Sequence, residues 1–153
     1  MEIGKEWTFE HTIECSVSSD FAWKFWTKVE NWVVDADLES VELRGGFTAG
    51  AHGITHSKSS GRIEWYLKEV SPPRRAVMEV PAPGAVAKFV WTFEDVRGRA
   101  RITQRASLSG EQASKYVDTV GRALQAGIPA GMRKHSEAME IAAQKPANNP
   151  IPD

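Results

Sequence analysis

The sequence predicts an α+β domain in which helices pack against one face of an antiparallel β-sheet. Three observations lead to this fold class. Apolar and polar side chains alternate in about seven segments, as in strands with one buried face. Two further segments, residues 18–33 and 109–128, carry apolar side chains at helical spacing. Short turns join six of the strands in succession, which favours antiparallel pairing.

The N-terminal part of the chain is expected to form a strand followed by two short helices. In residues 7–15 (WTFEHTIEC), period-two alternation places His11 on the apolar side. The spacing then becomes helical. Ser18 or Ser19 can cap the start of the first helix, and a second short helical turn carries Trp32.

Six strands are expected to follow. They lie in LESVELRG, AHGITHS, RIEWYLKEV, AVMEV, AKFVWTFEDV and ARITQRASLS. The prolines of SPPRR mark a turn, because proline cannot extend a central strand. The segment RGR is a tight hairpin turn centred on Gly98. The expected order is therefore strand, two short helices, six strands and a long C-terminal helix.

The last long segment predicts that C-terminal helix. Residues 109–128 carry one apolar stripe with polar side chains opposite. Gly127, Pro129 and Gly131 are expected to bend or break the helix before a further helical stretch that reaches Met139.

Length and composition fit one soluble domain. The chain has 153 residues, 41% of them hydrophobic and 25% charged, with a net charge of −1. We therefore expect a single domain over residues 1–143, followed by a Pro- and Asn-rich disordered tail over residues 144–153. The near-neutral charge gives no bulk attraction to nucleic acid, so no nucleic-acid partner is expected.

Location is predicted from what the chain lacks. No apolar run approaches the roughly 18 residues of a membrane span. The N-terminal segment MEIGKEWTFEHTIE is charged and has no apolar core of a signal peptide. Cys15 is the single cysteine, which excludes an internal disulfide and fits a reducing compartment. We expect a cytoplasmic protein without a membrane span; the oligomeric state is left open.

The order of elements resembles the helix-grip fold of the START-like, Bet v 1-like and polyketide cyclase/dehydrase superfamily. FAWKFWTKVENW resembles its first helix pair, and FTAGAHGI resembles its glycine-containing second and third strands. GRIEWYLKEVSPPRRAVME resembles the middle strands, and FVWTFEDVRGRARITQRASLSG the last hairpin. The resemblance covers about residues 7–143. It implies a curved antiparallel sheet of about seven strands wrapped around a long C-terminal helix, with a cavity between them.

The resemblance also implies a range of functions. Members of the superfamily bind lipids, hormones or aromatic polyketides, some catalyse cyclisation or dehydration, and others act as chaperone cofactors. The fold alone does not select among these activities. We expect a binding protein for a hydrophobic small molecule, which is lipid, aromatic or polyketide-like. A polyketide cyclase/dehydrase-like enzyme and a chaperone-cofactor-like interaction module are the alternatives, and no cofactor is expected.

Expected ligand-binding residues come from the inward faces of this architecture. The resemblance places a helix stripe and three strand aromatics at the cavity. These residues are Tyr116, Val120, Leu124 and Ile128 on the helix and Trp65, Phe89 and Trp91 on the strands.

Four more positions are predicted for the same site: Trp32, which could pack a ligand at the cavity mouth, and the polar side chains Gln104, His52 and His56. Gln104 alternates with Ile102 and can hydrogen-bond a ligand oxygen. His52 and His56 share one side of a predicted strand, where four residues span ~13 Å, too far for one zinc ion. They either face the pocket or are exposed and structural.

The segment DADLE raises the possibility of a metal or mouth site. Asp35 and Asp37 stand at the first and third positions of a possible calcium loop, but Ser40 and Gly46 stand where that loop needs Gly and Glu. No metal site is therefore expected. The segment is either a solvated strand start or, through Asp35 beside Trp32, part of a cavity mouth.

The catalytic residues are left unknown, with weak candidates only. For the enzyme alternative, the acid/base candidates are His11, Asp35, Glu79, His52 and His56. Histidine changes charge near neutral pH, and His11 lies on an apolar strand face, where a core role is the alternative. Glu79 is a candidate if it faces the cavity and has no special role if it faces water.

Overall fold

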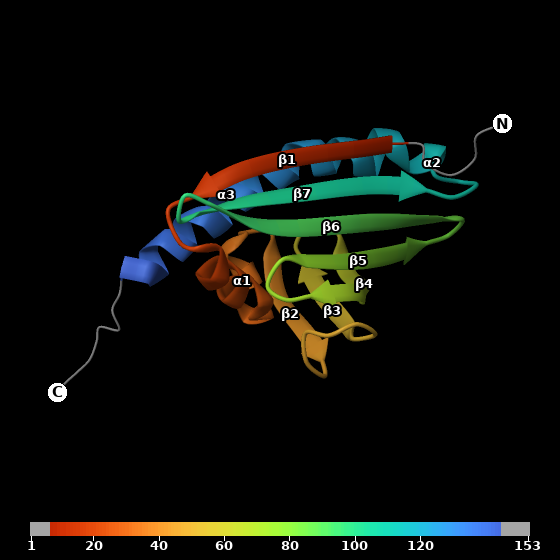
Figure 1. Ribbon diagram of the computed structural model, residues 1–153. Coiled ribbons are helices and arrows are strands. Elements are labelled where there is room, and N and C mark those ends of the chain that lie inside the picture. The colour runs from red at the N-terminus through yellow and green to blue at the C-terminus, as the bar shows by residue number, and fades with distance from the viewer. Residues whose placement is uncertain (1–6, 145–153) are drawn as a thin grey trace.

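A seven-stranded antiparallel sheet forms the centre of the structure, a computed structural model that describes residues 7–144 (Figure 1). The strand order is β1-β7-β6-β5-β4-β3-β2, and every neighbouring pair is antiparallel. The predicted α+β class and seven strands are confirmed. The strands are β1 (Trp7–Cys15), β2 (Leu38–Arg44), β3 (His52–Ser57), β4 (Gly61–Ser71), β5 (Arg75–Ala82), β6 (Ala85–Val96) and β7 (Arg99–Ser109).

As predicted, two short helical elements follow the first strand, and a long helix follows the last strand. Figure 1 shows the long C-terminal helix running along the sheet behind β1 and β7. The first helix contacts β6, β7 and this C-terminal helix. The helical elements are α1 (Ser19–Thr27), the 3-10 turn η1 (Val29–Val34), α2 (Ser114–Tyr116), the π-helical turn η2 (Val117–Gly121) and α3 (Arg122–Gln144).

The first helix pair brings indole rings into the core. Ser18 Oγ accepts a hydrogen bond from the Phe21 amide at 3.1 Å, which confirms the predicted cap. The buried face of α1 carries Trp23 and Trp26. The turn η1 adds Trp32, whose Nε1 donates to the Trp26 carbonyl at 2.7 Å. This bond fixes the two helical elements relative to each other.

The expected break of the C-terminal helix is wrong. The helix continues through Pro129, and α3 extends to Gln144. Pro129 cannot donate a hydrogen bond to the carbonyl of Gln125, and Gln125 is an exposed residue. Beyond the proline, Met132 and Met139 are almost completely buried, and this burial outweighs the weak helix propensity of the segment.

The chain ends lie beyond the described residues. A disordered tail is predicted over residues 144–153. Gln144 ends α3, and residues 145–153 lie outside the described residues. The single-domain boundary stays a prediction. Within residues 7–144, no helix combines the length and the apolar character needed to cross a bilayer. The cytoplasmic location also stays a prediction.

Candidate functional site

A cavity of about 580 Å³ lies between the sheet and α3. This volume falls within the range of small-molecule sites in proteins. Its walls come from α1, η1, the start of β2, β3 to β7 and α3, so segments far apart in the sequence meet around it. The apolar lining residues include Trp26, Trp32, Leu38, Ile63, Trp65, Met78, Val80, Phe89, Trp91, Leu124, Ile128 and Met132.

Four indole rings form one wall of the cavity. Their centroids follow one another at 4.7 Å (Trp91–Trp26), 5.6 Å (Trp26–Trp32) and 5.1 Å (Trp32–Trp65), with interplanar angles of 25° to 28°. Offset aromatic pairs of this kind stabilise by about 0.5–1.5 kcal/mol each beyond their burial. We name these four rings the indole wall. Because each ring comes from a different element, the wall also ties β4, α1, η1 and β6 together.

Gly53 makes room for one end of the indole wall. It pairs with Trp65 across β3 and β4, and a Cβ atom at this position would collide with the indole ring. The Trp65 Nε1 in turn donates to Thr55 Oγ1 at 2.8 Å. The orientation of Trp65 is therefore fixed by a small residue below its ring and by a hydrogen bond at its edge.

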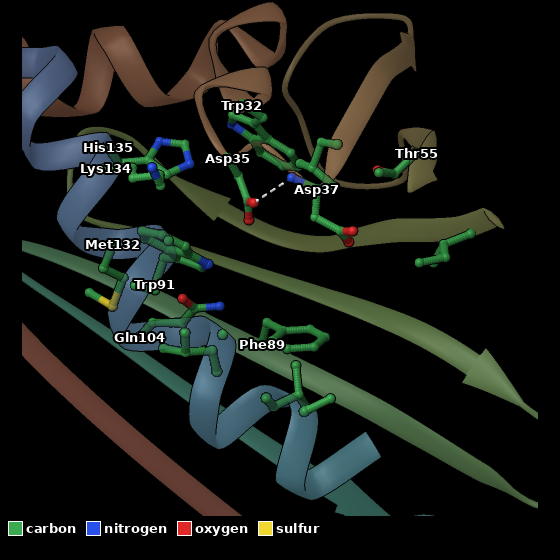
Figure 2. Close-up of a pocket in the computed structure, with 18 of the residues that line it drawn as sticks. Trp32, Asp35, Asp37, Thr55, Phe89, Trp91, Gln104, Met132, Lys134 and His135 are labelled. Carbon is green, nitrogen blue, oxygen red and sulfur yellow. Dashed lines mark hydrogen bonds between the residues drawn. The ribbon is translucent and has the colours of Figure 1, made fainter. Parts of the chain in front are cut away.

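Asp35 is the carboxylate that points into the cavity (Figure 2). It follows η1, and its Oδ1 accepts a hydrogen bond from the Asp37 amide at 3.0 Å. Its Oδ2 faces α3 so closely that a Cβ on Gly131 would lie 3.4 Å away. Within residues 7–144, no protein donor bonds to this second oxygen. The mouth or pocket interpretation of Asp35 therefore agrees with its position.

Asp37 has a different environment, although it also lines the cavity. Its oxygens accept hydrogen bonds from Ser57 Oγ at 2.6 Å, Ser59 Oγ at 2.8 Å and the Ser59 amide at 3.1 Å. These bonds hold the pKa of Asp37 below its usual value. Asp37 therefore anchors the β3–β4 turn to the start of β2, and its partly exposed position directly before that strand agrees with the interpretation as a solvated strand start.

His135 was missed by the sequence analysis, and it shares the cavity with Asp35. Only 9% of its surface is exposed, and its Nδ1 has no hydrogen-bond partner. Burial lowers the pKa of His135 to about 4, against the opposing effect of the Asp35 charge. The ring packs against Trp91 edge to face, with centroids 6.3 Å apart. At neutral pH this imidazole is uncharged.

Eight of the residues predicted for the site line this cavity. They are Trp32, Asp35, Trp65, Phe89, Trp91, Gln104, Leu124 and Ile128. The strand residues among them follow from period-two alternation along β4, β6 and β7. Gln104 lies on the inner face, while Arg101 and Arg105 pair with Glu14 and Glu10 on the outer face.

Tyr116 and Val120 do not line the cavity, which corrects the predicted helix stripe. The π-helical turn η2 adds one residue to a turn, so the i, i+4 spacing no longer joins Tyr116 to the inner face. Gly121 takes the buried position, and it lies close to the Trp7 ring, while Val120 is 36% exposed. The Tyr116 hydroxyl donates to the Pro83 carbonyl at 2.8 Å, so its role is structural.

His52 and His56 lie on the outer face of the sheet, so the pocket-facing alternative is wrong. Thr55 on the same strand lines the cavity. Because side chains alternate along a strand, His52 and His56 both point to the opposite face of the sheet. His52 Nε2 lies 3.0 Å from Glu64 Oε1, and its ring stacks on Tyr66 with centroids 4.8 Å apart.

His11 and Glu79 are also outside this cavity. His11 lines a separate hollow of about 260 Å³ between β1 and α3, together with Pro129 and Arg133. Glu79 pairs in register with Tyr66 and Lys88 and lies on the face opposite Met78 and Val80, which line the cavity. His135, which lines the cavity, was not among the five acid/base candidates.

The signal for His135 was present in the sequence. Ile128, Met132, His135 and Met139 follow helical spacing, and all four are buried. The expected helix break at Pro129 hid this continuation of the apolar stripe. Within the described residues, no group of three His, Cys, Asp or Glu side chains is arranged to hold a metal ion.

No family model and no curated protein matches the chain. Solved structures match it at low sequence identity. A norcoclaurine synthase point mutant from Thalictrum flavum, in complex with a transition-state analogue, has a TM-score of 0.71 at 11% identity over 94% of this chain and 100% of that one. Ara h 8.0201 has a TM-score of 0.72 at 11% identity, over 87% and 97% of the two chains. The Zhui aromatase/cyclase from Streptomyces sp. R1128 has a TM-score of 0.67 at 15% identity, over 93% and 96%. The chain therefore has the helix-grip fold that these structures share.

Proposed function

We propose that the protein binds a hydrophobic small molecule in the cavity between the sheet and α3. The observation that carries this proposal is a preformed space of about 580 Å³ with the indole wall on one side and few polar groups. Two solved structures of similar fold support the same use of this space. One norcoclaurine synthase is in complex with a transition-state analogue, and another is in complex with dopamine and hydroxybenzaldehyde.

Planar aromatic or polyketide-like molecules fit the wall best. Flat rings can lie against the indole wall, and Phe89 on β6 and Leu124 on α3 supply further apolar surface. A flexible lipid would meet the same apolar atoms but would lose more conformational freedom in a cavity of this size. The polar groups Asp35, Gln104 and His135 would fix the orientation of the ligand.

Calorimetric titration with 2-naphthalenemethanol tests the proposal. Gly127 lines the cavity, and a Cβ added there meets open space, so Gly127→Leu should fill the site without harming the helix. We expect this variant to lose tenfold or more in affinity. Gly46→Leu is the matched control, because Gly46 also has open space around it but does not line the cavity. Equal binding by both variants would contradict the proposed location.

A second function, proton transfer to or from a bound ketone, is favoured by one observation. Asp35 and His135 line the same cavity, which places a carboxylate and an imidazole beside a bound ketone. This is the polyketide cyclase/dehydrase-like alternative. The test is exchange of the methyl protons of 2-acetonaphthone in D₂O, followed by NMR. Faster exchange with the protein, lost in His135→Leu, would support it, and equal rates would exclude it for this ketone.

The chaperone-cofactor-like alternative receives less support. A filled cavity and a large exposed apolar patch would be the signs of such a module. The cavity here is open space, and the exposed large hydrophobic side chains within residues 7–144 are on separate elements. They are Val33, Tyr66, Val120 and Ile141.

A further inference from the structure

We infer that the ligand carries a positively charged amino group that pairs with Asp35, an inference that rests on the proposed binding function. The ligand class is then an aromatic amine, with its rings against the indole wall and its nitrogen beside Asp35 Oδ2. The contacts of each charged group on the cavity wall lead to this choice.

Asp35 has one oxygen available for a ligand. Its Oδ1 is held by the Asp37 amide, but Oδ2 bonds to no donor and no cation within the described residues. Asp35 is half-buried on the cavity wall, so a cation can pair with Oδ2 while the rest of the ligand lies against the apolar lining. An ammonium group supplies both the opposite charge and the N–H donors that this oxygen lacks.

The other charged groups of the cavity do not offer the same site. Asp37 already accepts three hydrogen bonds from Ser57 and Ser59. Lys134, the cationic side chain on the cavity wall of residues 7–144, is exposed to solvent and forms no ion pair with Asp35. Asp35 Oδ2 is therefore the strongest unoccupied acceptor in this space.

His135 is a second polar residue on the wall of this cavity. More than nine-tenths of the residue is buried, and its Nδ1 lacks a partner, which is costly in a protein interior. Figure 2 shows its ring on the α3 side of the same space as Asp35. Because burial keeps the imidazole uncharged, His135 neither neutralises Asp35 nor repels a cation.

Three naphthalene compounds that differ only in one substituent test the inference. Calorimetry at pH 7 compares 2-naphthylmethylamine, which is cationic, with 2-naphthalenemethanol and 2-naphthoate. We expect the amine to bind at least tenfold more tightly than the alcohol and the acid to bind most weakly. The preference for the amine should fall when salt is raised, because the pair is partly screened.

Asp35→Asn assigns the preference to this carboxylate. Asn keeps the Oδ1 acceptor for the Asp37 amide, so the local fold should persist. The variant should bind the amine and the alcohol about equally, so the ratio of the two affinities should fall by tenfold or more relative to the wild type. Asp118→Asn is the control. It changes the net charge by the same amount, and Asp118 is exposed and lies outside the cavity.

The outcomes separate this inference from the proposed function. If the alcohol binds in a Gly127-dependent manner but the amine has no advantage, or if Asp35→Asn keeps the advantage, the amine inference is wrong and the cavity function stands. Tighter binding of the acid also overturns it, since Lys134 would then dominate. If none of the three compounds binds, both proposals fail.

Discussion

Replacing His135 by Leu removes a buried imidazole that the folded protein holds uncharged. Burial lowers the pKa of His135 from an ordinary 6.5 to about 4. In the unfolded chain the imidazole takes up a proton as the pH falls below about 6.5, while in the folded protein it does so only near pH 4. The wild type therefore keeps its full stability above pH 6.5 and loses part of it as the pH falls toward 4.

The size of this loss follows from the two pKa values. They differ by about 2.5, and each pKa unit corresponds to ~1.36 kcal/mol, so the wild type should lose ~3 kcal/mol of unfolding free energy through His135. His135→Leu has no such loss. At pH 7 the variant should be at least as stable as the wild type, because it also removes the unpartnered Nδ1, worth about 1–3 kcal/mol.

Urea unfolding of both proteins at several pH values between 7 and 4 measures the effect. Carboxylates with lowered pKa values, such as Asp37 and Glu140, also cost stability in acid, but they are present in both proteins and cancel in the difference. The gap between the variant and the wild type should widen by ~3 kcal/mol over this range. A gap that stays constant with pH would refute the account of His135 as a buried, uncharged group.

Other substitutions test the boundary between core and cavity. Leu67→Ala should cost about 2–5 kcal/mol of unfolding free energy because Leu67 is fully buried, whereas Leu124→Ala should cost ~1 kcal/mol or less because Leu124 is partly exposed and faces open space. Equal costs in urea unfolding would contradict the cavity. Gly53→Ala should lower the melting temperature by several degrees, since its methyl group collides with Trp65; an unchanged melting temperature would count against this packing. Tyr116→Phe should cost about 1 kcal/mol and leave ligand affinity unchanged, because its hydroxyl only tethers the helix to a turn.

The sheet could be predicted because its signals are local. Alternation along residues 87–96 identifies a strand and also assigns Phe89 and Trp91 to one face, whatever the strand later packs against. The same rule assigned Gln104 to the inner face of β7. The face on which a strand residue lies depends only on a period of two, so the residues assigned to the inner face are found in the cavity lining.

The helix side of the site could be predicted only in part. Its stripe depends on a regular 3.6-residue period, and the one-residue insertion in η2 shifts that period between Tyr116 and Leu124. The continuation past Pro129 depends on burial against the sheet rather than on local propensity, which explains why His135 was missed. The meeting of Asp35 and His135, 100 positions apart in the chain, is set by the tertiary packing.

The indole N–H signals of the six tryptophans give the most direct test of ligand binding in this cavity. Four of these residues form the indole wall, while Trp7 and Trp23 do not line the cavity. In an NMR titration with 2-naphthalenemethanol, we expect large shifts of the signals of the wall tryptophans and small shifts of those of Trp7 and Trp23. Unchanged signals, or changes confined to Trp7 and Trp23, would show that this ligand does not bind in the cavity.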